Sequence, residues 1–187
     1  LACFNAHGLW IVDIRNGRKI ADHRWETNYD VNAVTPIVSG RNVFISSGYG
    51  VGCTLVNMGD GGLREVYRNK DMCNHYNSFV LYKGNLYGIS GNAGRGELRC
   101  MDYETGEVHW THKGLGTGGL MLADGKLIVQ GERGDLAIFE ATPEKPKLLA
   151  KADGVLGGVC WTVPVLSHGR LYCRNTRGDL VCLDLTK

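Results

Sequence analysis

The chain has 187 residues, of which 43% are hydrophobic and 27 are glycines spread along its length. Its 21 basic and 19 acidic residues give a formal charge of +2, so it lacks the dense basic surface that nucleic-acid binding requires. No apolar stretch approaches the ~20 residues of a membrane helix, and no charged-then-apolar leader precedes Leu1, so we expect neither a transmembrane segment nor an export signal.

Two series of glycine-marked segments recur along the chain with a period of about 40 residues. One series marks tight hairpins between a first and a second strand, at Gly40, Gly84, Gly125 and Gly169. The other opens a third strand, at Gly8, Gly52, Gly96, Gly134 and Gly178. Each period has room for four short strands, and no segment shows a sustained helical period. The sequence therefore predicts an all-β fold, a β-propeller of four-stranded antiparallel blades.

The predicted repeat units form a single domain of about four to five blades or part-blades, and in chain order they cover approximately residues 1–33, 34–76, 77–117, 118–160 and 161–187. The first unit is expected to supply only the outer two strands of a blade, and the last unit the inner three. These ends duplicate each other instead of completing one blade. We therefore expect an incomplete ring, cut from a longer protein or completed by a homodimer.

The segment LRCMDYETGEVHW illustrates the second half of one unit. Asp102 ends the third strand, Thr105 and Gly106 form the turn, and Trp110 lies on the fourth strand. Asp and Thr satisfy backbone N–H groups in turns, and glycine supplies the left-handed residue. The related VDIRNGRKIADHRW places Asp13, Gly17 and Trp25 in the same order. Two copies predict structural roles in turns and blade packing for all of these residues.

Seven cysteines occur with no C-x-x-C spacing. This pattern supports neither a disulfide framework nor a zinc ribbon. Cys100, Cys173 and Cys182 alternate with apolar neighbours inside strand-like segments, so we predict that they are small buried hydrophobic residues.

In a propeller, the connections from the outermost strand of one blade to the innermost strand of the next open near the central axis. Here these connections are NYDVNAVTP, DMCNHYNSF, GLGTGG and GVCWTVP, and they carry Asp30, Asn32, Cys73, His75, Asn77, Thr117, Cys160 and Trp161. Two interpretations stay open. These residues either form a binding site for a protein or small ligand, or they satisfy exposed backbone and line a wet channel.

Three narrower patterns also occur in or beside these connections. Cys73 and His75, two residues apart, suit a metal such as zinc or copper if they lie on one face of a strand and Cys160 joins them; with two ligands alone, no metal site is predicted. GLGTGG fits a dinucleotide-binding pattern but is followed by a hairpin, not a helix, so that function is rejected. Tyr49 and Trp161 are either exposed aromatic residues for a protein or glycan ligand, or part of blade packing.

MDYETGEVHW resembles the repeat of the pyrroloquinoline-quinone-like (PQQ-like) propeller family, in which a strand ending in Asp precedes a Thr-Gly turn and a Trp. The resemblance covers nearly the whole chain, and residues 158–185 are similar to the last blade of bacterial proteins related to the outer-membrane assembly lipoprotein B. Propellers of this family usually have seven or eight blades. The resemblance therefore implies a C-terminal fragment of a larger propeller.

The family contains two functional branches. Its enzymes are quinoprotein dehydrogenases that hold PQQ beside a vicinal disulfide, a calcium ion and an Asp base, whereas this sequence has no adjacent Cys pair and no matching calcium-ligand set. The other branch uses the propeller as a platform for proteins. The resemblance implies a non-catalytic scaffold with no cofactor, in a periplasmic or other extracytoplasmic location. The alternatives are a quinoprotein-type oxidoreductase that uses PQQ and calcium, or a metal-binding propeller that uses Cys73 and His75.

Overall fold

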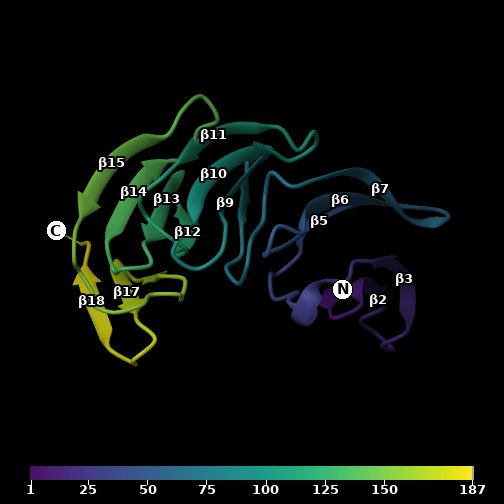
Figure 1. Cartoon of the computed structure of the whole chain (residues 1–187), viewed down its shortest axis with the longest axis horizontal. Helices are drawn as coiled ribbons and strands as arrows, with labels where there is room; N and C mark the ends of the chain where they lie inside the picture. Colours follow the sequence, from purple (N-terminus) through teal and green to yellow (C-terminus); the bar gives the residue numbers. More distant parts are fainter. Residues whose placement is uncertain (187) are drawn as a thin grey trace.

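The computed structural model describes residues 1–186, which form strands β1 to β18 and one short 3-10 helix, η1 (Asn28–Asp30). The strands make five antiparallel sheets. Figure 1 shows these sheets following one another along an open arc, with the N-terminal sheet at one end and the C-terminal sheet at the other. The predicted all-β, propeller-like fold is confirmed. In the part of the chain described, no helix has the length and apolar character needed to cross a membrane.

Three sheets have four strands and two have three, and each sheet lies within one of the predicted repeat units. The four-stranded sheets contain β4 (Ile37–Ser39), β5 (Asn42–Ser47), β6 (Gly52–Gly59) and β7 (Gly62–Asn69); β8 (Val80–Tyr82), β9 (Asn85–Ser90), β10 (Glu97–Asp102) and β11 (Val108–His112); and β12 (Gly119–Ala123), β13 (Lys126–Gln130), β14 (Leu136–Glu140) and β15 (Lys147–Ala152). The three-stranded sheets contain β1 (Ala2–Asn5), β2 (Gly8–Val12) and β3 (Lys19–Arg24), and β16 (Val165–Ser167), β17 (Arg170–Arg174) and β18 (Leu180–Asp184).

The N-terminal sheet corrects one expectation. It contains three strands, not two, because Ala2–Asn5 pairs with Gly8–Val12 from Ala2↔Ile11 to Asn5↔Gly8. This four-residue strand is too short to show a clear alternation of apolar and polar side chains, which is the pattern by which strands are found in a sequence. The C-terminal sheet has its three inner strands, β16 to β18, as predicted.

The core lies between neighbouring sheets. Every residue of β9 is buried, whereas every residue of β15, an outermost strand, is exposed. One core cluster joins Phe44 of β5 to Leu86 of β9, and the Phe44 ring packs against the edge of Phe79 with centroids 5.1 Å apart. Because a middle strand is covered on both faces by adjacent sheets, both faces of that strand must be compact and largely apolar.

Four of the five glycines that open third strands are required by a close approach of backbones, whereas Gly178 in the last sheet meets nothing within 4 Å among the described residues. A Cβ atom placed on Gly52 would lie 2.1 Å from the carbonyl oxygen of Asn69, and one on Gly134 would lie 1.5 Å from that of Leu156. The same contact recurs at Gly8 and Gly96, at 2.3 and 2.6 Å from the oxygens of His23 and Gly116. The chain leaving each fourth strand therefore runs directly over this position, a constraint that is stronger than turn formation alone.

The turns between third and fourth strands satisfy their own polar groups. The Asp102 carboxylate accepts hydrogen bonds from the backbone N–H groups of Glu104 (2.9 Å) and Thr105 (2.8 Å), and Gly106 has φ 75°. Burial by itself would raise the pKa of Asp102, but these hydrogen bonds outweigh it and the pKa is lowered.

The N-terminal sheet repeats this turn. The Asp13 carboxylate accepts from the backbone N–H (2.9 Å) and the guanidinium of Arg15, and Gly17 has φ 72°. The hydrogen bond from the Arg15 side chain lowers the pKa of Asp13.

The two tryptophans of these units lie between sheets. Trp25 is 1% exposed, belongs to the core cluster of the first two sheets, and donates its indole N–H to the Ser47 hydroxyl at 3.0 Å. Trp110 is 7% exposed and donates to the carbonyl of Thr142 at 2.8 Å. An indole buries a large apolar area when its single polar group finds a partner, as both do here.

The three cysteines predicted to be buried do not behave alike. Cys100 and Cys173 are buried, whereas Cys182 is exposed. Cys182 lies on β18, the outermost described strand of its sheet, so no fourth strand or further sheet in residues 1–186 covers it.

Candidate binding face

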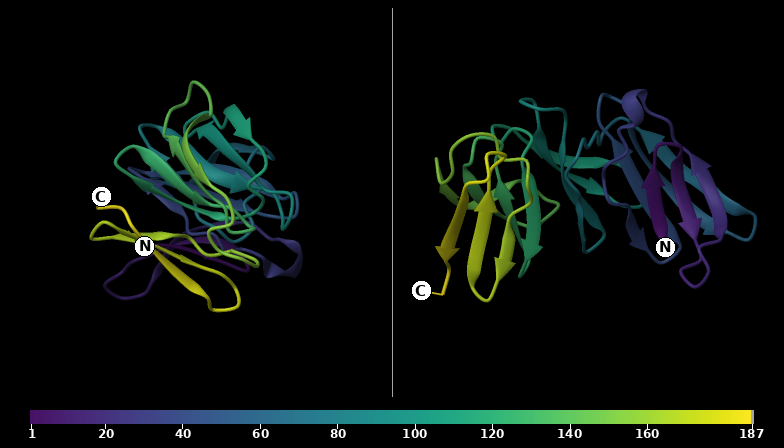
Figure 2. Two further views of the ribbon diagram at one scale, coloured as in Figure 1. Left: turned by 90° about the vertical axis from the view of Figure 1, so that its left-hand side faces the viewer. Right: turned by 90° about the horizontal axis from the view of Figure 1, so that it is seen from below.

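Two kinds of connection meet at one end of the sheets: the links between successive sheets and the loops between second and third strands. We call this end the loop face, and the opposite end, with the tight hairpins and the Asp turns, the turn face. In the right-hand view of Figure 2, η1, which lies in the link between the first two sheets, is at the upper edge, and hairpins of the terminal sheets are at the lower edge. The loop face comprises residues 25–36, 48–51, 70–79, 91–96, 113–118, 131–135, 153–164 and 175–179.

The first predicted loop contributes one buried and one exposed residue. The Asn32 amide donates to the carbonyls of Asn5 (2.8 Å) and Trp25 (3.0 Å), and its oxygen accepts from Ser47 at 2.7 Å. Asp30 is exposed on η1 with φ 54°. The polar groups of Asn32 are therefore engaged within the protein, whereas Asp30 faces outward.

Cys73 and His75 lie in a loop, not on a strand as their predicted shared face required. The Cys73 thiol contacts the carbonyl of Lys70 at 3.4 Å, whereas the His75 ring packs between Tyr49 and Tyr76. Burial raises the pKa of the Cys73 thiol and lowers the pKa of His75. At neutral pH the pair is a thiol and a neutral imidazole.

The third predicted metal ligand lies elsewhere. Cys160 is fully buried in an apolar cluster with Leu171 and Cys173, between the last two sheets. Within residues 1–186 no group of three or more His, Cys, Asp or Glu side chains is placed to hold a metal ion.

Asn77 and Thr117 fasten neighbouring sheets to each other. The Asn77 amide donates to the carbonyl of Gly118, and the Thr117 hydroxyl donates to that of Asn92 at 2.5 Å. Both side chains are buried. The Asn77 bond crosses between two repeat units, and the Thr117 bond ties the link before β12 to the β9–β10 loop. These residues therefore fix the relative positions of the loops.

The residue that unites the loop face is Glu132, which the sequence analysis did not single out. Its carboxylate accepts hydrogen bonds from the backbone N–H groups of Gly94 (2.8 and 3.0 Å) and Thr117 (3.0 Å) and from the Trp161 indole (3.1 Å). These donors come from three successive sheets or links. Charge-assisted bonds of this kind are stronger than neutral ones.

A sequence signal for Glu132 existed. Loops between second and third strands open on the same face as the links between blades, so QGERGD belongs with the predicted loops as much as GVCWTVP does. The residues of this second loop series that contribute most to the face are Tyr49, Asn92, Arg95, Glu132 and Arg133.

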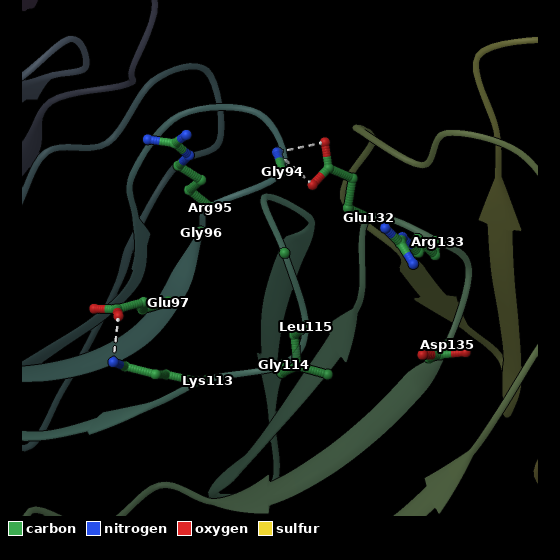
Figure 3. Close-up of a pocket in the computed structure, with 11 residues that line it drawn as sticks. Gly94, Arg95, Gly96, Glu97, Lys113, Gly114, Leu115, Glu132, Arg133 and Asp135 are labelled. Carbon is green, nitrogen blue, oxygen red and sulfur yellow. Dashed lines mark hydrogen bonds and ion pairs between the residues drawn. The ribbon is translucent and has the colours of Figure 1, made fainter.

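A cavity of about 500 Å³ opens beside Glu132, between the third and fourth sheets. Figure 3 shows the Glu132 carboxylate reaching Gly94 across the cavity, and Lys113 meeting Glu97 on another side. The lining residues are Gly94, Arg95, Gly96, Glu97, Lys113, Gly114, Leu115, Gly116, Glu132, Arg133 and Asp135.

The acidic side chains of this cavity have internal partners. Glu97 pairs with Arg99 at 2.8 Å, and the hydrogen bond from Arg99 lowers the pKa of that carboxyl group. Asp135 accepts from the backbone N–H of Gly154 at 2.8 Å. Arg95 and Arg133, by contrast, are exposed. The rim of the cavity therefore offers cationic groups to a binding partner.

Exposed aromatic rings extend across the same face. Tyr49 is 52% exposed and Trp161 is 39% exposed, so neither ring is fully consumed by blade packing. Trp161 lies 5.2 Å from Tyr76, and Tyr49 lies 4.7 Å from His75, measured between ring centroids. The predicted loops thus meet through aromatic contacts as well as through hydrogen bonds.

Comparison with known proteins identifies relatives of this fold. The family model described as "Outer membrane protein assembly factor BamB" matches residues 1–112. No curated protein matches the chain at a significant level.

Several solved structures resemble the chain, and three of them illustrate the likeness. BamB from Moraxella catarrhalis is 16% identical, with a TM-score of 0.67 over 93% of this chain and 50% of that one. The computationally designed Ika8 protein is 12% identical, with a TM-score of 0.68 over 96% and 53%. The designed Ika4 protein is 13% identical, with a TM-score of 0.59 over 82% and 90%. The chain spans about half the length of the first two, and at these identities the likeness shows the fold alone.

Proposed function

The chain belongs to the PQQ-like β-propeller family of the outer membrane protein assembly factor BamB, and from this membership we propose that it is a non-catalytic scaffold that binds a partner protein through its loop face. The name of the family describes a protein that acts in assembly. An extracytoplasmic location belongs to the same proposal.

The observation that carries the proposal is the set of hydrogen bonds on Glu132. One carboxylate holds Gly94, Thr117 and Trp161, and with them the loops of neighbouring sheets, in a single arrangement. A surface that is already ordered loses little conformational freedom when it binds. This rigidity suits a docking platform better than a lid or a mobile active-site loop.

The chemistry of the loop face supports a binding role. The raised pKa of Cys73 and the lowered pKa of His75 leave a neutral thiol beside a neutral imidazole. An activated cysteine nucleophile needs the opposite arrangement, with a lowered thiol pKa. The exposed Arg95 and Arg133 are suited to acidic groups on a partner.

The residues present do not fit the quinoprotein site described for the enzymes of this family. That site needs a vicinal disulfide, whereas the seven cysteines are free and none is adjacent to another. The carboxylates beside the cavity, Glu97, Glu132 and Asp135, are already engaged by protein donors. We therefore derive no reaction step through PQQ or calcium.

Site-specific photocrosslinking tests the proposal. A photoreactive amino acid is introduced at Arg95 or Arg133 on the loop face, and at Lys126 or Glu104 on the turn face, in cells that make the protein. We expect the two loop-face positions to give a discrete adduct with the same protein, identified by mass spectrometry, and the turn-face positions to give none. Equal adducts from both faces, or none from either, would contradict the proposal.

A further inference from the structure

Five aromatic rings from four separate connections form a continuous row on the loop face. We call Tyr29, Tyr49, His75, Tyr76 and Trp161 the aromatic row. In that order, successive ring centroids are 6.2, 4.7, 4.8 and 5.2 Å apart. The row begins at η1, passes the β5–β6 loop and the link before β8, and ends in the link before β16.

The outer members of the row are held on the surface by unusual backbone conformations. Tyr29 has φ 68° and is 86% exposed, and Tyr49 has φ 54° and is 52% exposed. Left-handed conformations are unfavourable for large side chains, and they normally fall on Gly, Asn or Asp. Apart from these two and Asp30, the non-glycine residues with positive φ among residues 1–186 are polar or charged, namely Lys83, Asp124 and His168.

Burial does not offset the backbone strain of these two tyrosines, because both side chains are largely exposed. A ring that packed the core would be covered by its neighbours, as Trp25 and Trp110 are. Strained conformations that packing does not explain are a feature of binding sites. We therefore expect the aromatic row to bind a ligand that covers its rings.

We propose that the aromatic row binds a proline-rich segment of the partner protein in the polyproline II conformation. This inference rests on the proposed function and names the chemical class of the segment that the loop face receives. Proline-rich segments dock into aromatic-lined grooves because the polyproline II helix is already ordered before it binds.

The shape of the row fits such a segment. Neighbouring rings are inclined to each other by 62°, 71°, 50° and 48°, so they do not form one flat platform. With neighbours between 4.7 and 6.2 Å apart, every second ring can lie one polyproline turn, about 9 Å, from the next. A proline on each turn can then pack between successive inclined rings.

The hydrogen-bonding groups also favour this ligand. A polyproline segment lacks most N–H groups and needs only donors for its carbonyl oxygens. Within residues 1–186 the hydroxyl groups of Tyr29 and Tyr49 make no hydrogen bond and can serve as these donors. The Tyr76 hydroxyl, in contrast, is used internally, donating to Thr117 at 3.0 Å.

A glycan fits this surface less well. Sugar hydroxyls need many free donors and acceptors, but those nearest the row are already bound within the protein. The Thr117 hydroxyl bonds to Asn92, the Asn77 amide to Gly118, and the Glu132 carboxylate to three donors that include Trp161. The rings are also too strongly inclined to stack together on the face of one sugar chain.

The test is a binding titration by fluorescence anisotropy. A fluorescein-labelled peptide of ten prolines is titrated with the purified protein, and a labelled Gly-Ser peptide of the same length serves as the control ligand. We expect saturable binding of the proline peptide alone. Unlabelled cellohexaose is added as a competitor and is expected to leave the anisotropy unchanged.

Three variants locate the site. Tyr49→Asn removes one ring and places a residue that suits the left-handed turn, so the fold is retained. Trp161→Ala removes another ring, and Lys83→Asn makes the same kind of turn change on the opposite face. We expect Tyr49→Asn and Trp161→Ala each to weaken peptide binding about tenfold or more, as truncation of aromatic binding residues does, and Lys83→Asn to have no effect.

The outcomes separate this inference from the proposed function. The inference would be overturned if the wild-type protein failed to bind the proline peptide or if cellohexaose displaced the peptide. It would also be overturned if the Tyr49→Asn and Trp161→Ala variants bound the peptide as tightly as the wild-type protein does. If loop-face crosslinks still formed in that case, the scaffold function would stand with a different class of ligand. Thermal unfolding of each variant, followed by circular dichroism, shows that the protein under test is folded.

Discussion

The loop face and the turn face are built from the same repeat but are held together differently. On the turn face the carboxylates are bound locally: Asp13 binds Arg15, Asp102 binds Thr105, and Asp184 binds Thr186. The Asp102 turn is also bound by the preceding sheet, because Tyr67 and Asn69 donate to the carbonyls of Tyr103 and Gly106. On the loop face they join residues far apart in sequence, such as Tyr49 to Asn92, with a separation of 43, and Gly94 to Glu132, with a separation of 38. The turn-face carboxylates thus act within one blade, whereas the Glu132 carboxylate on the loop face acts between blades.

This difference indicates where specificity can arise in a repeat protein. Turns that satisfy themselves can be copied from blade to blade without change, so they distinguish one propeller little from another. Loops that are held by their neighbours can vary as long as the set remains compatible. Glu132 and the aromatic row both lie on the loop face.

The largest predicted effect compares a glycine on each face. In Gly134→Ala the new Cβ would lie 1.5 Å from the carbonyl oxygen of Leu156, so the backbone must move, whereas a Cβ at Gly40 on the turn face meets nothing within 4 Å among the described residues. We expect Gly134→Ala to lower the free energy of unfolding by about 3 kcal/mol or more, and Gly40→Ala by about 1 to 2 kcal/mol. Urea unfolding measures the free energy of both variants. Equal losses of unfolding free energy in Gly134→Ala and Gly40→Ala would contradict the prediction.

The next prediction concerns the carboxylates. Glu132→Ala leaves the N–H groups of Gly94 and Thr117 and the Trp161 indole without their acceptor, so we expect a loss of about 2 to 3 kcal/mol. Asp102→Ala removes a local turn acceptor and should cost about 1 kcal/mol. Glu132→Gln, which keeps an oxygen acceptor, should fall between them. Thermal unfolding that ranked Asp102→Ala above Glu132→Ala would contradict the comparison.

A smaller effect depends on pH and is confined to the turn face. The pKa of Asp102 lies below its ordinary value of 3.8. The stabilisation is therefore complete above that value and is lost as the pH falls through the lower pKa of the folded state. Asp102→Asn should narrow the difference in stability between pH 6 and pH 2 by less than about 1 kcal/mol, since the site is largely solvated. Urea unfolding at the two pH values measures this difference in stability. A wider difference in Asp102→Asn than in the wild-type protein would contradict the prediction.

The smallest predicted effect is a gain in stability in two variants, only one of which should lose peptide binding. Tyr49→Asn and Lys83→Asn both place a residue that tolerates positive φ where the native residue has φ 54° or 48°. Each should raise the free energy of unfolding by about 0.5 to 1 kcal/mol. Only Tyr49→Asn should weaken binding of the proline peptide. A destabilised Tyr49→Asn protein would mean that the Tyr49 ring contributes to folding more than to binding.

Much of the fold could be predicted from the sequence because its signals are local. The glycine series coincides with the hairpins and with the starts of the third strands, and Gly17 and Gly106 have positive φ in the structure. Strand β1 was missed because four residues are too few to show a period, and Cys182 was expected to be buried because its alternation is the same whether or not a neighbouring strand covers it. A pattern of side chains does not record what packs against it.

The sequence by itself determined the number of periods, the all-β class and the self-contained turns, since each follows from dihedral preferences and hydrogen bonds within a few residues. Only the tertiary structure decided that Glu132 joins three sheets, that Cys160 is separated from Cys73, and that five rings meet on one face. These arrangements depend on the angle and stagger between packed sheets. Residues about 40 positions apart come into contact only after that packing is fixed.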